Sequence, residues 1–250
     1  MAAVPPTDRW QSQRPLSTRV VGLQAGLPAT RRDAQGEWRT AIGKQPVRMA
    51  RIGAEGLAGD AVADTQHHGG AEKAVLAYAA GHYPAWEREW ARRLPFGAFG
   101  ENFTLEGGDE SSVCIGDVWA VGQARLQISQ PREPCYKPGR YWQLPEVMER
   151  MIATRRTGWY LRVLTPGEAA AGAEMTLVER AWPEWTVARA LAIFYAREYP
   201  NRAEPAAGAL TADPGNADPD VTALASDAAA LAGCPALSPR WRSRLASSGG

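Results

Sequence analysis

The chain has 250 residues and a formal net charge of +1, with 45% hydrophobic and 22% charged residues, as in an ordinary soluble globular protein. This charge balance gives no electrostatic case for a nucleic-acid partner or a membrane surface, and no apolar run approaches the roughly 18 residues of a membrane span. The first residues lack the apolar segment of a secretory signal, so we expect a cytoplasmic protein.

Short β-type segments, broken by glycine turns, follow a polar, proline-bearing arm that we assign to residues 1–16. Apolar and polar residues alternate in 124–130, as expected of a half-buried strand. Many short strands with glycine turns indicate a barrel or a sandwich. The predicted strands are 19–26, 37–43, 47–52, 74–78, the start of 103–112, 118–122, 124–130, 158–164 and 174–180.

Two helices interrupt these strands, and three more follow them. Apolar residues at helical spacing predict helices over 82–94 and 144–156, and then over 185–198, 220–233 and 238–247. We therefore place a domain boundary near residue 181, between a β domain over 17–181 and a small three-helix domain over 182–250. The latter contains a Pro/Ala-rich loop at 200–220. The helical tail is a lid, a dimer element, a docking site or a packing appendage.

The three cysteines, Cys114, Cys135 and Cys234, are widely spaced and form neither a disulfide framework nor a CxxC motif. Cys135 stands in ISQPREPCYKPGR, between Arg132 and Lys137 in a proline-stiffened loop. Nearby cations favour the thiolate, which is the form that acts as a nucleophile or a metal ligand. The other two cysteines lie in apolar surroundings or in the tail, so we expect them to be inert.

Lysine is rare: only Lys44, Lys73 and Lys137 occur among 28 basic residues. In such an arginine-rich chain, each lysine is a candidate for a task that suits a compact point charge, such as pairing with a phosphate. The alternative is that the three remain by chance.

The segment 56–78 contains a second candidate site, in which His67, His68, Gly69 and Gly70 stand directly before Lys73. Paired glycines allow close backbone approach to a ligand, and successive N–H groups there can bind an anion. The spacing matches no metal motif. The alternative is a hairpin turn with polar residues.

Other polar residues in these segments have two interpretations each. Asp60 and Asp64 either orient the histidines or cap turns. Asn102 follows Glu101 in FGENFT and either contacts a heterocycle or phosphate or is a turn residue.

Four motifs appear in the order HHGGAEKAV, FGENFT, VCIGD and QPREPCYK. In this combination the chain resembles the MOSC domain family (molybdenum cofactor sulfurase C-terminal domain). The resemblance covers roughly residues 18–235 and is strongest to the YiiM-like branch, which carries a small three-helix C-terminal domain. It implies a mainly β (α+β) fold, a MOSC-type β-barrel with peripheral helices followed by that helical domain.

The resemblance also implies a molybdenum–pterin cofactor whose metal is bound by the Cys135 thiolate, and reduction of small N-hydroxylated substrates such as 6-hydroxylaminopurine. The implied cofactor-binding residues would act through charge, close backbone approach or polar contact. They are Lys44, His68, Gly69, Gly70, Lys73, Asn102, Arg132 and Lys137. Our own hypothesis is that His67 or His68 supplies a proton to the leaving oxygen. Since no GxGxxG follows a strand, electrons would come from a separate redox protein.

Two alternatives stay open. The chain would be a cofactor carrier or sulfur-transfer module if Cys135 carries a persulfide, or a metal-free cysteine hydrolase if His67 or His68 acts as its base. One departure from the family follows the motif cysteine, where the common Trp-Lys-Leu becomes Tyr136-Lys137-Pro138. A proline there removes an N–H and is expected to stiffen the pocket wall. The sequence does not decide whether the protein is a homodimer.

Overall fold

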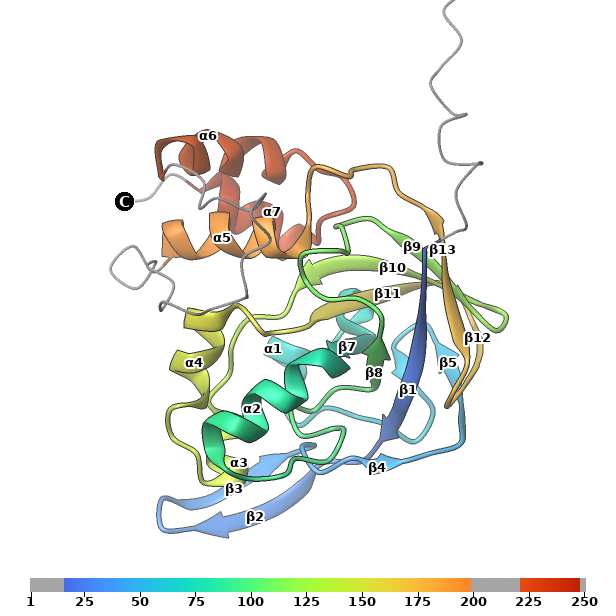
Figure 1. Ribbon diagram of the computed structural model, residues 1–250, viewed down its shortest axis with the longest axis vertical. Coiled ribbons are helices and arrows are strands. Elements are labelled where there is room, and N and C mark those ends of the chain that lie inside the picture. Colours follow the sequence, from blue (N-terminus) through green and yellow to red (C-terminus); the bar gives the residue numbers. More distant parts are fainter. Residues whose placement is uncertain (1–15, 199–220, 248–250) are drawn as a thin grey trace, which may run out of the picture.

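The computed structural model describes residues 16–198 and 221–247, without the side chains of 221–226. Most of the predicted arm at 1–16 and the predicted loop at 200–220 lie outside the described residues. The described chain forms a β-barrel with helices around it, and Figure 1 shows a separate group of three helices beside the barrel.

Seven strands close into the barrel, because the first and the last of them pair with each other. These strands are β1 (Ser17–Ala25), β7 (Val75–Ala79), β8 (Phe103–Glu106), β9 (Val118–Val121), β10 (Ala124–Pro131), β11 (Trp159–Thr165) and β13 (Glu174–Glu179). Their order around the barrel is β13, β9, β10, β11, β7, β8, β1, and Ser17 then pairs with Thr176. Only β7 and β8 are parallel, and η2 (Ala80–His82) and α2 (Tyr83–Trp90) form the crossover that parallel strands require.

Side chains that alternate along the strands fill the barrel. In β10, Leu126 and Ile128 are buried, whereas Arg125 and Gln127 are partly exposed. This pattern confirms the half-buried strand predicted for 124–130 and explains how a single strand serves both the core and the surface.

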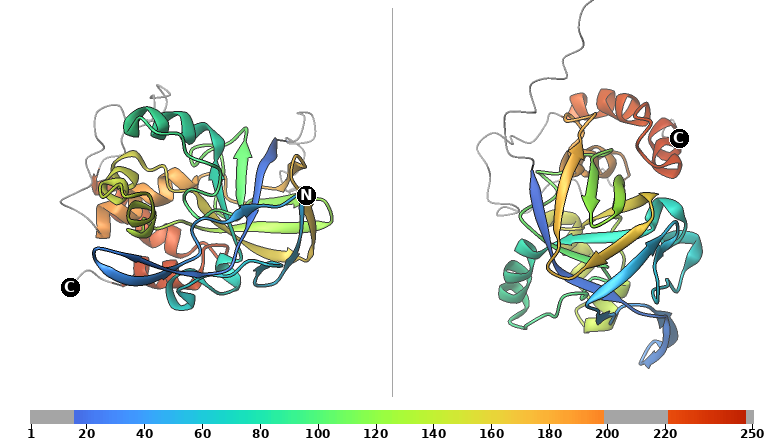
Figure 2. Two further views of the ribbon diagram at one scale, coloured as in Figure 1. Left: turned by 90° about the horizontal axis from the view of Figure 1, so that it is seen from below. Right: turned by 90° about the vertical axis from the view of Figure 1, so that its right-hand side faces the viewer.

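Six further strands lie outside the closed ring. They are β2 (Ala29–Asp33), β3 (Gly36–Thr40), β4 (Gln45–Pro46), β5 (Met49–Gly53), β6 (Gly56–Leu57) and β12 (Gly167–Ala170). The β2–β3 hairpin projects from the barrel (Figure 2). The prediction over 37–43 captured only β3, since all five residues of β2 are exposed and show no apolar alternation.

Helices α2 and α4 (Val147–Thr154) correspond to the predictions over 82–94 and 144–156, and they share a second, aromatic core. Tyr78 of β7 stacks on Phe99 with ring centroids 4.5 Å apart. Trp86 of α2 and Met151 of α4 are fully buried beside them. This second core fixes the segment 96–102 against the barrel.

The three C-terminal helices are α5 (Val187–Glu198), α6 (Val221–Ala232) and α7 (Pro239–Ala246). Phe194 stacks on Trp241 at 4.3 Å, and Arg189 pairs with Asp227 at 2.7 Å. The predicted fold class, a mainly β barrel with peripheral helices and a small C-terminal helical part, is confirmed. The boundary near residue 181 stays a prediction.

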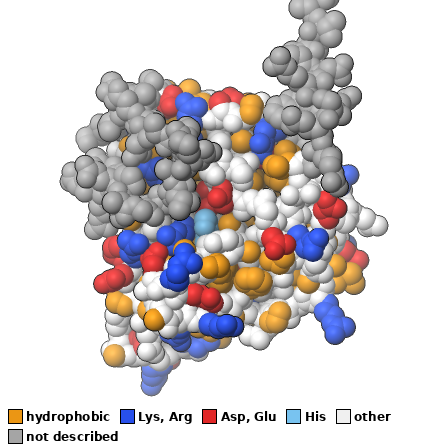
Figure 3. Space-filling model, viewed as in Figure 1, with side chains coloured by type: hydrophobic (Ala, Val, Ile, Leu, Met, Phe, Trp, Pro, Cys, Tyr) orange, Lys and Arg blue, Asp and Glu red, His pale blue; other side chains and the backbone are white. Residues whose placement is uncertain are grey.

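The described surface mixes both signs of charge. On the face shown in Figure 3, acidic and basic side chains are interspersed, in line with the net charge of +1. Within the described ranges, no helix has the length and apolar character needed to cross a bilayer.

Candidate functional site

A cavity of about 710 Å³ brings together segments that are far apart in the sequence. Its walls come from the 40–44 loop, the β5–β6 hairpin, the segment 58–74, the loop at 99–102, the cysteine loop at 132–138 and β11. Nine of the ten predicted site residues line it: Lys44, His68, Gly69, Gly70, Lys73, Asn102, Arg132, Cys135 and Lys137. His67 does not.

The candidate nucleophile or metal ligand, Cys135, lies between β10 and α3 (Lys137–Trp142) and is partly exposed. The backbone N–H of Lys137 lies 3.5 Å from its sulfur. The sequence interpretation of this stretch as a loop missed α3, which begins two residues after the cysteine. Pro138 falls in the first turn of α3, where a missing N–H removes no helical hydrogen bond. The cysteine is therefore held next to a helix start rather than within a long loop.

Arg132 is 3% exposed and lines the same cavity. Its guanidinium donates to the carbonyl oxygens of Phe99 at 3.0 Å and Thr157 at 3.4 Å. Its Nε–H has no hydrogen-bond partner among the described residues. Arg132 therefore brings a buried positive charge to the cavity wall.

The two neighbouring histidines of α1 (Thr65–His68) have different environments. His68 lines the cavity, and its Nδ1 lies 3.3 Å from the Tyr160 hydroxyl. Burial, together with the positive charges of Arg132 and Lys73, lowers the pKa of His68 to about 4. The ring is therefore neutral at neutral pH, which argues against His68 as the proton donor of the sequence hypothesis.

His67 is exposed, and its ring Nδ1 lies within hydrogen-bond distance of Asp64, at 3.0 Å. Asp64 also caps α1 by accepting the His67 N–H at 3.0 Å. Both interpretations of Asp64 therefore apply, because it caps α1 and orients the His67 ring, which does not line the cavity. The backbone oxygen of His67 instead accepts a hydrogen bond from Lys73.

Gly69 and Gly70 are suited to their positions for different structural reasons. A Cβ on Gly69 would lie 2.8 Å from the Thr65 carbonyl oxygen, so close packing against α1 requires glycine. Gly70 has φ +93° and leads into η1 (Ala71–Lys73), and a Cβ there would meet nothing within 4 Å. Gly70 therefore combines a left-handed backbone with open space beside the cavity.

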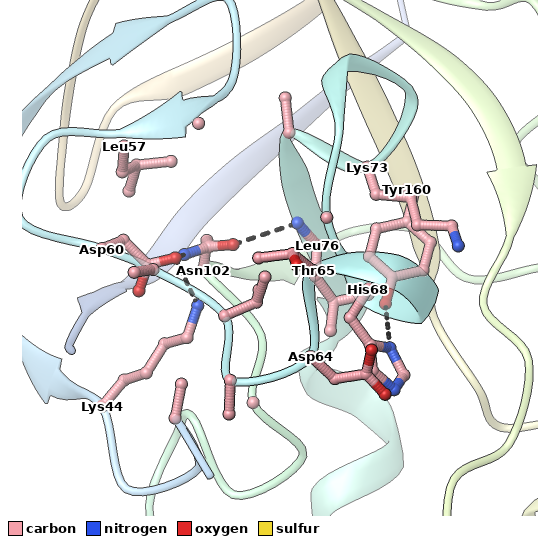
Figure 4. A pocket seen from close by; sticks show the side chains of 18 of the residues that line it. Lys44, Leu57, Asp60, Asp64, Thr65, His68, Lys73, Leu76, Asn102 and Tyr160 are labelled. Carbon is pink, nitrogen blue, oxygen red and sulfur yellow. Dashed lines mark hydrogen bonds and ion pairs between the residues drawn. The ribbon is translucent and has the colours of Figure 1, made fainter. Parts of the chain in front are cut away.

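At another part of the wall, Lys44 donates to Asp60 at 2.7 Å, and the Asn102 amide donates to the same Asp60 oxygen at 2.9 Å (Figure 4). Asn102 is 3% exposed and is also bonded to the Leu76 N–H and the Gln24 carbonyl. Asn102 therefore has a structural role in the wall, and its predicted ligand contact stays a prediction. Asp60 does not orient a histidine, contrary to one sequence interpretation.

Sequence reasoning missed Tyr160, whose buried hydroxyl contacts His68. Burial raises the pKa of Tyr160 to about 12, so the hydroxyl stays protonated and available as a donor. Its position in a β-type segment gave no functional signal, since a tyrosine in a strand is ordinary core material.

Comparison with known proteins agrees with this geometry. The MOSC domain family model matches residues 64–176. The uncharacterized protein YflK of Bacillus subtilis is 41% identical over 162 residues, which cover 64% of this chain and 73% of YflK. A protein named Reductase from Gibberella moniliformis is 37% identical over 170 residues, covering 65% of this chain and 30% of that protein.

The fold has a solved counterpart. The crystal structure of YiiM from Geobacillus stearothermophilus matches with a TM-score of 0.69 and 31% identity, over 91% of this chain and 97% of YiiM. The matches extend beyond the family-model segment to the C-terminal helices. The chain belongs to the MOSC domain family, with YiiM and YflK among its relatives.

Proposed function

We propose that this protein binds a molybdenum–pterin cofactor, with the Cys135 thiolate as the metal ligand, and reduces small N-hydroxylated compounds such as 6-hydroxylaminopurine. MOSC domains are associated with the molybdenum cofactor in general. The observation that carries the proposal is the placement of Cys135 on the wall of a large cavity that is also lined by Arg132, a buried cation.

The residues present fit such a group. A thiolate is a suitable ligand for a soft metal centre. The volume of about 710 Å³ lies within the usual range of cofactor and ligand pockets. Arg132, Lys73 and Lys137 line the cavity with positive charge, as an anionic cofactor requires, and Gly70 leaves space at its wall.

Within this proposal each residue has a defined task. Cys135 would hold the metal, Arg132 would supply positive charge at the cavity wall, and Lys44 and Lys73 would bind the phosphate of the cofactor. When bound, the molybdenum centre would supply the two-electron chemistry that removes an oxygen from nitrogen.

His68 would act as a neutral hydrogen-bonding group. If the Tyr160 hydroxyl donates to Nδ1, the ring proton resides on Nε2, so His68 presents a donor from a neutral ring. His67 is not a candidate proton donor in this arrangement, since Asp64 holds its ring at the surface.

The reaction consumes two electrons, which would come from a separate redox protein. The match to part of a fungal protein named Reductase supports a reductive activity. The separate electron donor and a possible homodimer stay predictions.

The test is turnover of 6-hydroxylaminopurine with a chemically reduced viologen dye, using protein from a host that makes the cofactor. We expect product with the wild type and with Cys234→Ser, at a buried cysteine that does not line the cavity, but none with Cys135→Ser. A cofactor-loaded wild type that leaves the substrate intact would refute the reductase. A mass increase of about 32 Da on Cys135, one added sulfur, would instead favour the sulfur-transfer alternative.

A further inference from the structure

Asp60 is an almost buried carboxylate in the segment between β6 and α1, and its side chain is 8% exposed. It accepts three hydrogen bonds: from the Gly26 N–H at 2.9 Å, the Lys44 ammonium at 2.7 Å and the Asn102 amide at 2.9 Å. Figure 4 shows Lys44 and Asn102 converging on this carboxylate from different segments. Nothing in the proposed function uses Asp60.

The carboxylate is held firmly by its other partners. Asn102 is itself fixed by Leu76 of β7 and Gln24 of β1, so it cannot follow Asp60 if that side chain rotates. The Gly26 N–H holds the second oxygen from the end of β1. Asp60 therefore has a defined orientation before any ligand binds.

Lys44 depends on that orientation. Its side chain is 4% exposed, and burial lowers its pKa, whereas the charges of Asp60 and the buried Glu101 act in the opposite direction. An ammonium has three N–H donors. Asp60 accepts one of them, and no second acceptor is recorded within 16–198 or 221–247. Since Lys44 lines the cavity, the remaining donors are available to a ligand there.

A purely structural ion pair is a weak explanation for this arrangement. Two buried charges are expensive to desolvate, and apolar residues of similar size often stabilise a fold equally well. The pair here stands at a cavity wall with donors left over, which is the arrangement expected of a binding group and its positioning partner.

We propose that Asp60 is the positioning residue that keeps Lys44 charged and aims its ammonium into the cavity, where it binds a phosphate-type anion. Asn102 acts through Asp60 rather than by touching the ligand. The proposal rests on the proposed function only for identifying this anion as the phosphate of the cofactor.

The low lysine content makes a direct test practical. Lysine labelled with ¹³C at Cε gives one signal each for Lys44, Lys73 and Lys137, assigned by Lys→Arg variants. Cofactor-free protein is titrated first with pH and then with inorganic phosphate. The variants are Asp60→Asn, Asp60→Glu and, as a matched control, Asp64→Asn, which removes a carboxylate from the same cavity lining without touching Lys44.

In the wild type and in Asp64→Asn, we expect Lys44 to be an ammonium at neutral pH and to shift on phosphate addition. Asp60→Asn should lower the pH at which Lys44 loses its proton and weaken its phosphate response by about tenfold or more, because a charged hydrogen bond is lost. Asp60→Glu retains the negative charge, so Lys44 should again be an ammonium at neutral pH in this variant. An unchanged Lys137 signal reports that each variant is folded.

Two results would overturn the proposal. One is a Lys44 titration and phosphate response in Asp60→Asn equal to those of the wild type. The other is a wild-type Lys44 signal that does not shift when phosphate is added. If Asp60→Asn does not fold, failure of Asp60→Glu to keep Lys44 charged would be decisive against it. None of these readouts involves molybdenum or turnover, so they are independent of the reductase hypothesis.

Discussion

Substitution of Glu101 tests how the fold holds the cavity wall. Glu101 is fully buried, and one of its oxygens accepts the Gly97 N–H at 2.7 Å, the Thr104 hydroxyl at 3.1 Å and the Tyr83 hydroxyl. Its other oxygen accepts the Phe99 N–H at 3.1 Å. The carbonyl of Phe99 in turn accepts Arg132, so this carboxylate supports the segment that positions a cavity residue.

Glu101→Gln retains one oxygen but places an NH₂ group against the Phe99 N–H. A hydrogen bond to a charged group contributes about 1.5–3 kcal/mol, and an unpaired buried N–H costs about 1–3 kcal/mol. We expect a loss of about 3 kcal/mol from a total stability of about 5–15 kcal/mol. For a chain of this size, that corresponds to a fall in Tm of about 6–12 °C.

Urea denaturation and calorimetry measure this change. Glu106→Gln is the matched control, because Glu106 is exposed on the following strand, and it should stay within about 0.5 kcal/mol of the wild type. A Glu101→Gln variant within about 1 kcal/mol of the wild type, with an unchanged denaturant slope, would contradict the inferred role of the carboxylate.

Two further predictions concern the histidines and the thiols. His68 takes up a proton below about pH 6.5 when unfolded but only below about pH 4 when folded, so the unfolding free energy should fall as the pH drops through this window. His68→Gln should remove that fall in urea titrations and His67→Gln should not; equal behaviour would contradict the assignment. Iodoacetamide at neutral pH should give the native protein one adduct, on Cys135, by mass spectrometry, because Cys234 is buried and burial raises the pKa of Cys114 to about 12. Comparable labelling of either buried thiol would show that its burial is overestimated.

Most strands of the barrel could be predicted from local sequence patterns, but the closure of the barrel could not. Alternation identified β10, and glycine turns delimited most of its neighbours. The pairing of Ser17 with Thr176 joins residues at opposite ends of the β domain, and no local pattern encodes it. The resemblance to a known family supplied this closure.

The candidate site was predicted largely by residue type, and the errors concern geometry. Adjacent helical residues point about 100° apart, so His67 and His68 cannot both face the cavity, and the sequence does not show which does. The hydrogen bonds of Lys44 and Asn102 to Asp60 could not be predicted from the sequence, because they join residues from three separate segments. Pro138 suggested a loop, although proline is also favoured in the first turn of a helix, where α3 has it.

The most direct test of the central claim is the molybdenum and pterin content of protein purified from a host that makes the cofactor. Elemental analysis and pterin fluorescence should give near-stoichiometric values for the wild type and for Cys234→Ser, and molybdenum should be lost in Cys135→Ser. A wild type without molybdenum or pterin would contradict the account, as would a Cys135→Ser variant that retains a full complement of both.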